Sequence, residues 1–220
     1  MARVVVVGSN RGIGLEICRQ LHARGDEVVA VCRTGSAALA GCSSSVHEGV
    51  DVTSRDSLGR LAQELGQQSV DVLWVVAGVM KRVTLDSLDL DMIRQQFEVN
   101  ALGPLLTVSA LLSCLHEGSK VGLMTSRMGS IADNTSGGSY GYRMSKAALN
   151  MAGKSLAVDL KKRAISVALL HPGFVRTEMT GDRGELDPPE AAQGLINRLD
   201  ALSLEQSGSF LHQNGTTLPW

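Results

Sequence analysis

The chain alternates between short, continuously apolar runs and longer segments in which apolar residues recur every three or four positions. The continuous runs predict strands at 4–7, 27–32, 46–52, 70–76, 120–125, 165–170 and 210–213. The helical spacing predicts helices at about 13–21, 58–65, 90–112, 140–163 and 188–202. The segment 35–45 is predicted to be a loop or a weak helical turn, and 174–187 a short flexible loop. Strands without polar alternation suit a parallel sheet covered on both faces, with helices as right-handed crossovers. We therefore expect a single α/β domain, because 220 residues are enough for one substantial core and few for two.

The predicted helix over 90–112 contains an interruption. Asn100 lies within its apolar stretch, and Gly103 and Pro104 follow within a turn. A glycine–proline pair disturbs helical hydrogen bonds. The interruption is therefore either a plain kink or a site where Asn100 redirects a backbone carbonyl.

The first predicted strand runs directly into a glycine-rich turn, V-V-V-V-G-S-N-R-G-I-G from Val4 to Gly14. Gly8, Gly12 and Gly14 allow the backbone to turn tightly and to approach a ligand closely. The helix that follows aims its free N–H groups and its positive dipole end at the same place, which favours a pyrophosphate. A glycine turn with a purely structural role is the alternative.

The end of the second predicted strand bears on the choice of cofactor. In a dinucleotide-binding fold, a carboxylate at this position holds the adenosine ribose, whereas an arginine accommodates a 2′-phosphate. Here the strand ends in Cys32, Arg33 and Thr34, without a carboxylate, and Arg11 lies in the glycine turn. The two arginines favour NADP(H) over NAD(H), unless both are simply solvated.

Asp51 ends the third predicted strand and allows two interpretations of equal weight. It is one of three residues, with Thr53 and Ser54, that can cap the next helix. Alternatively, its carboxylate faces the adenine amino group.

The helix from Tyr140 carries the candidate chemistry. Tyr142 and Lys146 are four residues apart, so their side chains lie on one helix face. An ammonium about 5 Å from the phenol, at an effective dielectric of about 20, favours the phenolate by roughly 3 kcal/mol. We therefore expect the pKa of Tyr142 to be lowered by about two units, into a range useful for proton transfer. A boundary tyrosine beside a solvated lysine is the alternative.

Two further polar sites lie at strand ends, where ligands of open α/β sheets collect. Ser126 to Ser130 follow the fifth predicted strand. His171 ends the sixth, and a structural role is simpler for it than that of a general base, because it directly precedes Pro172.

Composition excludes several classes of function. A net charge of −1 and a pI near 6.5 leave no basic field for nucleic acid. The four cysteines form no C-x-x-C pair and have no histidine at zinc spacing, so we expect no metal site and reduced thiols. No apolar run is long enough to span a membrane, and we expect a cytoplasmic protein.

Taken together, these motifs resemble the short-chain dehydrogenase/reductase family over essentially the whole chain. The resemblance implies a single doubly wound (Rossmann) domain over 1–220, with a parallel sheet of about seven strands flanked by helices. The glycine turn fits the family's Thr-Gly-x3-Gly-x-Gly motif, and Ala77-Gly78 fits the tail of Asn-Asn-Ala-Gly. The ending, from Asn214-Gly215 to Pro219-Trp220, is most similar to the C-factor-type carbonyl reductases.

The resemblance also implies roles for individual residues. The catalytic tetrad is expected to be Asn100, Ser126, Tyr142 and Lys146; Tyr140 does not fit, since Met144 stands four residues later. The expected NADP(H)-binding residues are Gly8, Ser9, Asn10, Arg11, Gly12, Ile13, Gly14, Arg33, Asp51, Val52, Ala77, Gly78, Tyr142, Lys146, Pro172, Gly173, Val175 and Thr177.

Two features depart from the family pattern. Val7 replaces a threonine, and Val75-Val76 replaces two asparagines, so side-chain hydrogen bonds worth about 1 kcal/mol each are lost. We expect a slightly looser cofactor cleft. The substrate loop, at about 174–188, is short and predicts an open site.

The function expected from the resemblance is NADPH-dependent reduction of a small carbonyl compound, with Tyr142 as acid and base. Adaptable apolar residues, namely Met80, Met128, Phe174 and Met179, are expected to line the substrate pocket. The first alternative is a non-enzymatic NADP(H)-binding regulatory or signalling protein. A nucleotide-sugar epimerase or dehydratase fits less well, because such enzymes need an additional substrate domain. A homodimer or homotetramer is implied by resemblance alone.

Overall fold

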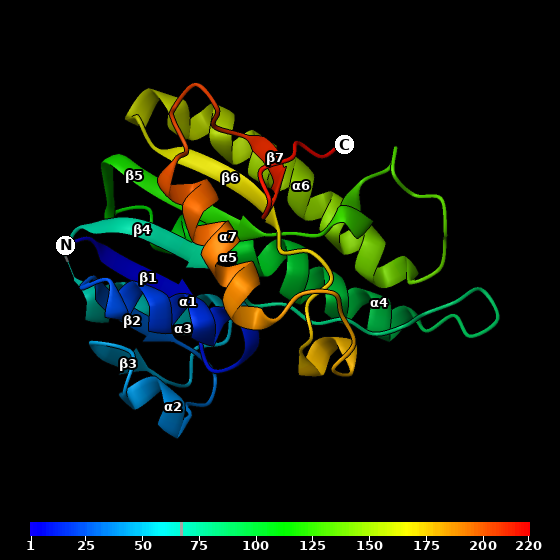
Figure 1. The fold of residues 1–220 in the computed structure, drawn as a ribbon, viewed down its shortest axis with the longest axis horizontal. Coiled ribbons are helices and arrows are strands. Elements are labelled where there is room, and N and C mark those ends of the chain that lie inside the picture. The colour runs from blue at the N-terminus through cyan, green and yellow to red at the C-terminus, as the bar shows by residue number, and fades with distance from the viewer. Residues whose placement is uncertain (67) are drawn as a thin grey trace.

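The protein is built on one parallel sheet with the strand order β3-β2-β1-β4-β5-β6-β7 (Figure 1). The computed structural model describes residues 1–66 and 68–220. The strands are β1 (Arg3–Val7), β2 (Glu27–Val31), β3 (Ser45–His47), β4 (Val70–Val75), β5 (Leu115–Met124), β6 (Ser166–His171) and β7 (Ser209–His212). All six ladders between them are parallel, which confirms the predicted fold class. The strand order reverses between β1 and β4, and ligands bind at such a switch point.

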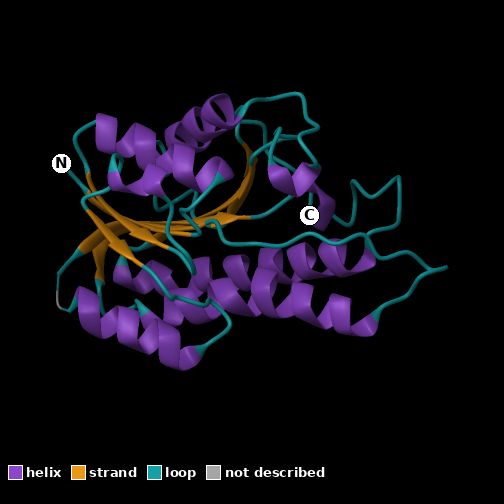
Figure 2. Cartoon of the chain, turned by 90° about the horizontal axis from the view of Figure 1, so that it is seen from below, coloured by secondary structure: helices purple, strands orange, loops and turns teal. Residues whose placement is uncertain are grey.

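Helices cover both faces of the sheet (Figure 2). One face carries α1 (Gly12–Ala23) and α7 (Pro188–Asp200), and the other carries α3 (Arg55–Leu65), α5 (Gly103–Ala110) and α6 (Tyr140–Leu160). The four valines of β1 explain why the first run is continuously apolar. Val4 and Val6 belong to the core under α1 and α7, whereas Val5 and Val7 belong to the core under α3 and α6. A strand buried on both faces therefore needs apolar residues at every position.

Two strands differ clearly from the predictions. β3 is only three residues long and is an edge strand, and the apolar residues that follow it pack in a loop. β5 begins at Leu115 and not at residue 120. In the segment 35–45, the helical alternative is the one found, as the one-turn helix α2 (Ala37–Ala40).

The interruption around Asn100 is a π-helix. It spans Glu98–Leu102 and joins α4 (Leu90–Phe97) to α5 without a break. Pro104 lies in the first turn of α5, directly after the π-helix, where the helical hydrogen-bond pattern changes. Gly103 lets the helix approach the loop after β3, since a Cβ there would lie 2.8 Å from a methyl group of Val52. π-helical turns are frequent at functional sites.

Backbone contacts replace the polar side chains that are missing at the ends of β1 and β4. The Val7 carbonyl accepts hydrogen bonds from the N–H groups of Val76 (2.8 Å) and Ala77 (3.0 Å). Gly8 packs so closely that a Cβ on it would lie 2.5 Å from the Ala77 nitrogen. The floor of the predicted cofactor cleft is therefore held by main-chain atoms despite the valines.

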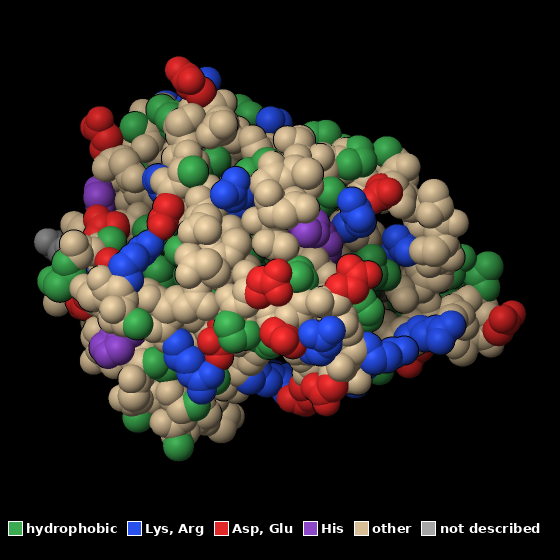
Figure 3. Space-filling view, viewed as in Figure 1, with side chains coloured by type: hydrophobic (Ala, Val, Ile, Leu, Met, Phe, Trp, Pro, Cys, Tyr) green, Lys and Arg blue, Asp and Glu red, His purple; other side chains and the backbone are tan. Residues whose placement is uncertain are grey.

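Charged side chains of both signs are interspersed on the face seen in Figure 3. No helix in the described ranges 1–66 and 68–220 is long and apolar enough to cross a membrane.

The capping of α3 gives a first test of the fold. The Ser54 hydroxyl accepts a hydrogen bond from the Ser57 N–H (3.2 Å) at the start of this helix. We expect Ser54→Ala to lower the free energy of unfolding by about 1 kcal/mol, measured by urea denaturation. Ser139, which precedes α6, makes no such bond, so Ser139→Ala is the matched control with little change. Equal losses in both variants would contradict the capping role.

Candidate active site

Three adjoining cavities form a groove along the carboxyl ends of the strands. The first, the Arg33 cavity, is lined by Arg33 and Asp51. It shares Gly8, Ala77 and Gly78 with the second, the glycine-turn cavity. The third, the Tyr142 cavity, has a volume of about 400 Å³ and shares five lining residues with the second, Tyr142 among them. The groove therefore connects the glycine turn to the predicted catalytic residues.

The glycine turn offers free backbone donors to this groove. Helix α1 begins at Gly12 with no side-chain cap and no acidic residue in its first turn. Gly8 and Gly12 have φ angles of +94° and +54°, which only glycine adopts without strain. A Cβ on Gly14 would lie 2.0 Å from the Gly8 carbonyl oxygen. An uncapped helix N-terminus on a side-chain-free turn fits a pyrophosphate, so these residues suit a dinucleotide.

Other predicted residues of the turn point elsewhere. The Ser9 hydroxyl is buried and donates to the Val31 carbonyl (3.1 Å). The Asn10 amide donates to the Thr34 carbonyl (3.1 Å). Both side chains hold the turn against β2 and the residues that follow it. Ser9 and Asn10 would therefore contact a cofactor through their backbone atoms.

The two arginines of the NADP(H) hypothesis lie in different cavities. Arg33 is exposed and lines the first, beside Asp51. Arg11 lines the second, where its guanidinium forms an ion pair with Glu178 from the substrate loop. Arg33 thus lies beside Asp51, whereas Arg11 is paired with Glu178, and contact of either arginine with a 2′-phosphate stays a prediction. The pairing with Glu178 had no signal in the sequence because the two residues are 167 positions apart.

Asp51 does not cap α3, because Ser54 does. One Asp51 carboxylate oxygen accepts hydrogen bonds from the N–H and the hydroxyl of Thr53, both at 2.8 Å. These bonds, together with the charge of Arg33, hold the pKa of Asp51 below its usual value. The second carboxylate oxygen remains available in the Arg33 cavity, which supports the ligand interpretation.

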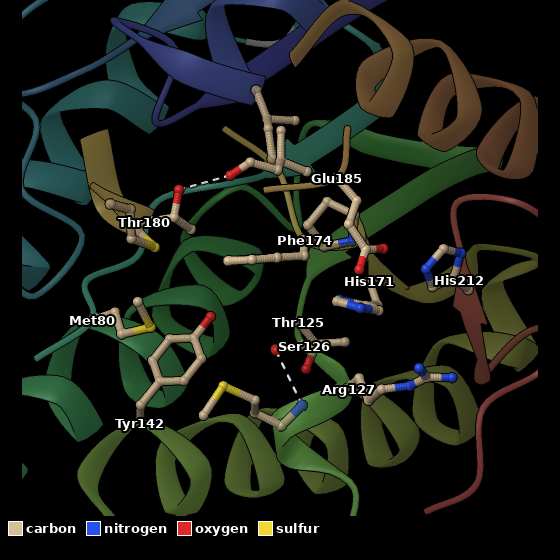
Figure 4. Close-up of a pocket in the computed structure, with 16 residues that line it drawn as sticks. Met80, Thr125, Ser126, Arg127, Tyr142, His171, Phe174, Thr180, Glu185 and His212 are labelled. Carbon is tan, nitrogen blue, oxygen red and sulfur yellow. Dashed lines mark hydrogen bonds between the residues drawn. The ribbon is translucent and has the colours of Figure 1, made fainter. Parts of the chain in front are cut away.

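Helix α6 and the end of β5 bring three members of the predicted tetrad together. Tyr142 and Lys146 are both buried, on the same face of α6. The Lys146 ammonium donates to the Met124 carbonyl (2.8 Å) and lies 5.8 Å from the centre of the Tyr142 ring. Ser126 follows Met124 by two residues and lines the same cavity as Tyr142 (Figure 4). The i, i+4 spacing thus predicted the shared face correctly.

The expected lowering of the tyrosine pKa is wrong for this structure. Burial raises the pKa of Tyr142 and outweighs the opposing effect of the Ser126 hydroxyl. Burial also lowers the pKa of Lys146 to about 7, so at neutral pH the lysine carries only part of a charge. The estimate from spacing failed because it treated Lys146 as fully charged and Tyr142 as solvated.

Asn100, the fourth tetrad member, is completely buried in the π-helix. Its amide donates to the Val79 carbonyl (2.8 Å) and to the Ser145 hydroxyl (3.0 Å), and its oxygen accepts from the Val79 N–H (2.8 Å). The side chain thereby ties the loop after β4 to α6. Both amide protons are used, so a water held by Asn100 would have to donate to its backbone carbonyl or to the second lone pair of its side-chain oxygen.

The Tyr142 cavity has an apolar side and a polar side. Met80, Met128, Phe174 and Met179 all line it, as expected. Arg127, His171, Glu185 and His212 line it as well. The sequence placed Arg127, within Ser126 to Ser130, and His171 at strand ends, but it pointed to neither Glu185 nor His212. The four residues come from different strand ends or loops, which sequence spacing cannot bring together.

The substrate loop closes on itself by main-chain bonds. The Arg176 N–H donates to the Leu186 carbonyl (2.9 Å), and the Glu185 N–H donates to the Phe174 carbonyl (2.7 Å). Pro172, Gly173 and Val175 line the Tyr142 cavity, and Thr177 lines the glycine-turn cavity. The segment predicted as flexible therefore has a defined fold over the groove.

A family model described as short chain dehydrogenase matches residues 2–187. The chain belongs to this family. The fold of the chain is shared with the carbonyl reductase Sniffer of D. melanogaster, at a TM-score of 0.92 and 30% identity, each chain being fully covered. A carbonyl reductase from chicken fatty liver, solved with NADPH bound, gives a TM-score of 0.91 at 28% identity, with 100% of this chain and 99% of the other covered.

Two relatives of the chain are named for different activities, one as a dehydrogenase and one as a signal. The 1-hydroxy-2-glutathionyl-2-methyl-3-butene dehydrogenase of Rhodococcus sp. (strain AD45) is 49% identical over the full length of both chains. The C-signal of Myxococcus xanthus is 46% identical over 154 residues, which cover 69% of this chain and 93% of the relative. The predicted resemblance is confirmed, while the individual site residues remain predictions.

No cluster of three or more potential metal ligands occurs in the part of the chain that the structure describes.

The depressed pKa of Lys146 predicts how stability depends on pH. Between its pKa of about 7 in the folded state and the ordinary lysine value, the unfolded chain binds more protons, so stability rises with pH. We expect the free energy of unfolding of the wild type to rise with pH by up to about 1.4 kcal/mol per pH unit relative to that of Lys146→Met. Urea denaturation between about pH 7 and 8.5 measures it, and the upper limit keeps the pH from exceeding the ordinary pKa of a thiol. Parallel profiles for the two proteins would contradict this burial penalty.

Proposed function

We propose that the protein is an NADPH-dependent reductase of a small carbonyl compound. The observation that carries the proposal is that Ser126 and Tyr142 line one cavity, while Tyr142 and Lys146 line the adjoining cavity, which extends to an uncapped helix N-terminus. A dinucleotide and a small organic substrate fit these adjoining spaces, and Tyr142 lies where the spaces meet. Membership of an oxidoreductase family supports the same conclusion.

NADP(H) is the proposed cofactor. The backbone of Gly8 to Gly14 would hold its pyrophosphate, Asp51 its adenine, Arg33 its 2′-phosphate, and Lys146 its nicotinamide ribose. When bound, the reduced nicotinamide supplies hydride to the carbonyl carbon. The NADP(H) found in structural relatives supports this choice.

Ser126 and Tyr142 would act on the carbonyl oxygen. The Ser126 hydroxyl donates a hydrogen bond to it and stabilises the negative charge that develops there. Tyr142 then gives its phenolic proton to that oxygen, which leaves a phenolate. Its raised pKa keeps the phenol protonated at neutral pH, as an acid catalyst of reduction requires.

Lys146 and Asn100 would restore the proton. The lysine ammonium, one helical turn from Tyr142, stabilises the phenolate that the transfer leaves. The charge of that phenolate also favours protonation of Lys146, which offsets the cost of its burial. A water on the Asn100 carbonyl would connect this pair to solvent.

The reverse reaction is a second candidate. The Rhodococcus relative is named as a dehydrogenase of an alcohol that carries a glutathionyl group, so the same residues here would oxidise an alcohol with NADP⁺. A non-enzymatic signalling role has its support in the C-signal relative. Turnover measurements in both directions, over panels of carbonyl compounds and alcohols, separate the three possibilities.

Self-association is also proposed. Large apolar side chains are exposed on helices beside the active site, namely Leu102 at the end of the π-helix, Leu105 on α5, and Met144, Met151 and Val158 on α6. Covering these residues by a second copy would give a homodimer or homotetramer. Sedimentation would show it, and a strict monomer would oppose it.

The chain offers a matched pair of tyrosine variants as the main test. We expect Tyr142→Phe to bind NADPH with unchanged affinity and to lose activity by about 10²-fold or more, because the proton donor is removed. Tyr140, the other of two tyrosines, starts α6 outside the groove lining, so Tyr140→Phe should remain active. A fully active Tyr142→Phe enzyme would refute the proposed mechanism.

Cofactor choice rests on Arg33. We expect Arg33→Ala to weaken NADPH binding about tenfold, since a charge-assisted hydrogen bond is lost, and to leave NADH binding unchanged. Fluorescence titration measures both, and Arg60→Ala on the exposed side of α3 is the control. Preference of the wild type for NADH would overturn the assignment.

A further inference from the structure

The wall of the Tyr142 cavity away from Tyr142 is formed by two histidines and an arginine. His171 and His212 are register partners at the carboxyl ends of β6 and β7. Their rings meet edge to face, with centroids 5.0 Å apart. Arg127 follows Ser126 on the same side of the cavity, and Figure 4 shows all three across from Tyr142. We call His171, His212 and Arg127 the histidine wall.

Hydrogen bonding fixes the tautomer of His212. Its Nδ1 atom is 3.2 Å from the backbone nitrogen of Asn214. A backbone N–H can only donate, so Nδ1 is the acceptor and carries no proton. In the neutral ring the proton is therefore on Nε2, which makes Nε2 a donor.

We assign the same tautomer to His171. Its Nδ1 atom is fully buried and has no hydrogen-bond partner among residues 1–66 and 68–220. Nδ1 is therefore unpaired in either tautomer, but a proton on it would bury the single N–H group of the neutral ring away from every acceptor. A proton on Nε2 lies on the other edge of the ring, and His171 lines the cavity.

Both rings are neutral near pH 7. Burial lowers the pKa of His171 to about 3, and burial also lowers the pKa of His212, with a further contribution from Arg127. The charge of Arg127 is itself balanced by an ion pair with Asp133 (2.8 Å). Glu185 is the other charged group that lines the cavity. The histidine wall thus presents N–H donors with little net charge.

We propose that the histidine wall is a second polar subsite, which receives an oxygen acceptor of the substrate, a carboxylate or an amide carbonyl, remote from the reacting carbonyl. The subsite rests on the proposed function for the reacting end of the molecule. Two imidazole N–H groups and a guanidinium match acceptor oxygens, whereas the methionines elsewhere in the cavity offer no directional partner. The substrate class is therefore an aldehyde or ketone that carries a carboxylate or carboxamide.

Three matched aldehydes test the subsite: 4-formylbenzoate, 4-formylbenzamide and 4-methylbenzaldehyde. With NADPH, we expect kcat/KM to be about tenfold higher for the acid and the amide than for the methyl compound, as one or two added hydrogen bonds would give. Equal values for all three aldehydes would overturn the subsite and leave the reductase proposal intact.

Variants of His212 identify the donor atom. Glutamine places an N–H close to the position of Nε2, whereas asparagine places it near Nδ1. His212→Gln should keep the preference for the acid and the amide over 4-methylbenzaldehyde, and His212→Asn should lose this preference about tenfold. The same pair at His171 repeats the test, and His22→Asn, on exposed α1 surface, is the control. Thermal unfolding and NADPH binding verify that each variant is folded.

Binding separates failure of this subsite from failure of the proposed function. Calorimetry with benzoate, benzamide and toluene, on the protein saturated with NADPH, needs no turnover. A preference for benzoate and benzamide that His212→Asn abolishes supports the subsite even if no aldehyde is reduced. A preference for benzoate alone, unaffected by the histidine variants, would assign recognition to Arg127 and overturn the role of the histidines.

Discussion

The ammonium of Lys146 is the constraint on which the site depends. Only 3% of this residue is exposed, and its Nζ atom is anchored on the Met124 carbonyl at the end of β5. Burying a cation is costly, and the fall of its pKa to about 7 expresses that cost. The helix that carries it must therefore pack tightly against the ends of β4 and β5.

That packing accounts for residues that are otherwise unremarkable. A Cβ on Gly129 would lie 2.7 Å from the Lys146 backbone, so the turn after Ser126 approaches α6 closely only because it has glycine. A Cβ on Gly78 would lie 3.2 Å from the Asn100 amide oxygen and 3.7 Å from the lysine nitrogen. Small residues on two strand ends thus bring Ser126, Asn100 and Tyr142 around one ammonium.

The sequence predicted those features that depend on local spacing. The continuous valines of β1, the glycine turn and the shared face of Tyr142 and Lys146 all follow from the strand and helix periods. The predicted lowering of the Tyr142 pKa was wrong, because sequence spacing shows which groups are neighbours but not how deeply they are buried. His212 was missed since its place beside His171 depends on the register of two strands about 40 residues apart, and register is a property of the whole sheet. The predicted boundaries of β3 and β5 were wrong for a related reason. An apolar residue extends a strand only where a neighbouring strand is available to pair with it.

The groove and the cavity are built in different ways. On the proposed cofactor side, glycines bring the main chains of β1, α1 and the end of β4 together, and the side chains of Arg33, Asp51 and Lys146 line the adjoining cavities. Side chains from β5, β6, β7 and the substrate loop form the substrate side. Substitutions in the second group can therefore change the substrate with little effect on the cleft that holds the dinucleotide.

Transfer of deuterium tests the central claim, hydride delivery in the Tyr142 cavity, most directly. A carbonyl compound that the protein reduces is incubated in ordinary water with NADPH that carries deuterium at both C4 positions, and the alcohol is analysed by mass spectrometry. If the hydride comes from the nicotinamide, the carbinol carbon of the product carries one deuterium. An alcohol that contains no deuterium from the cofactor would contradict it.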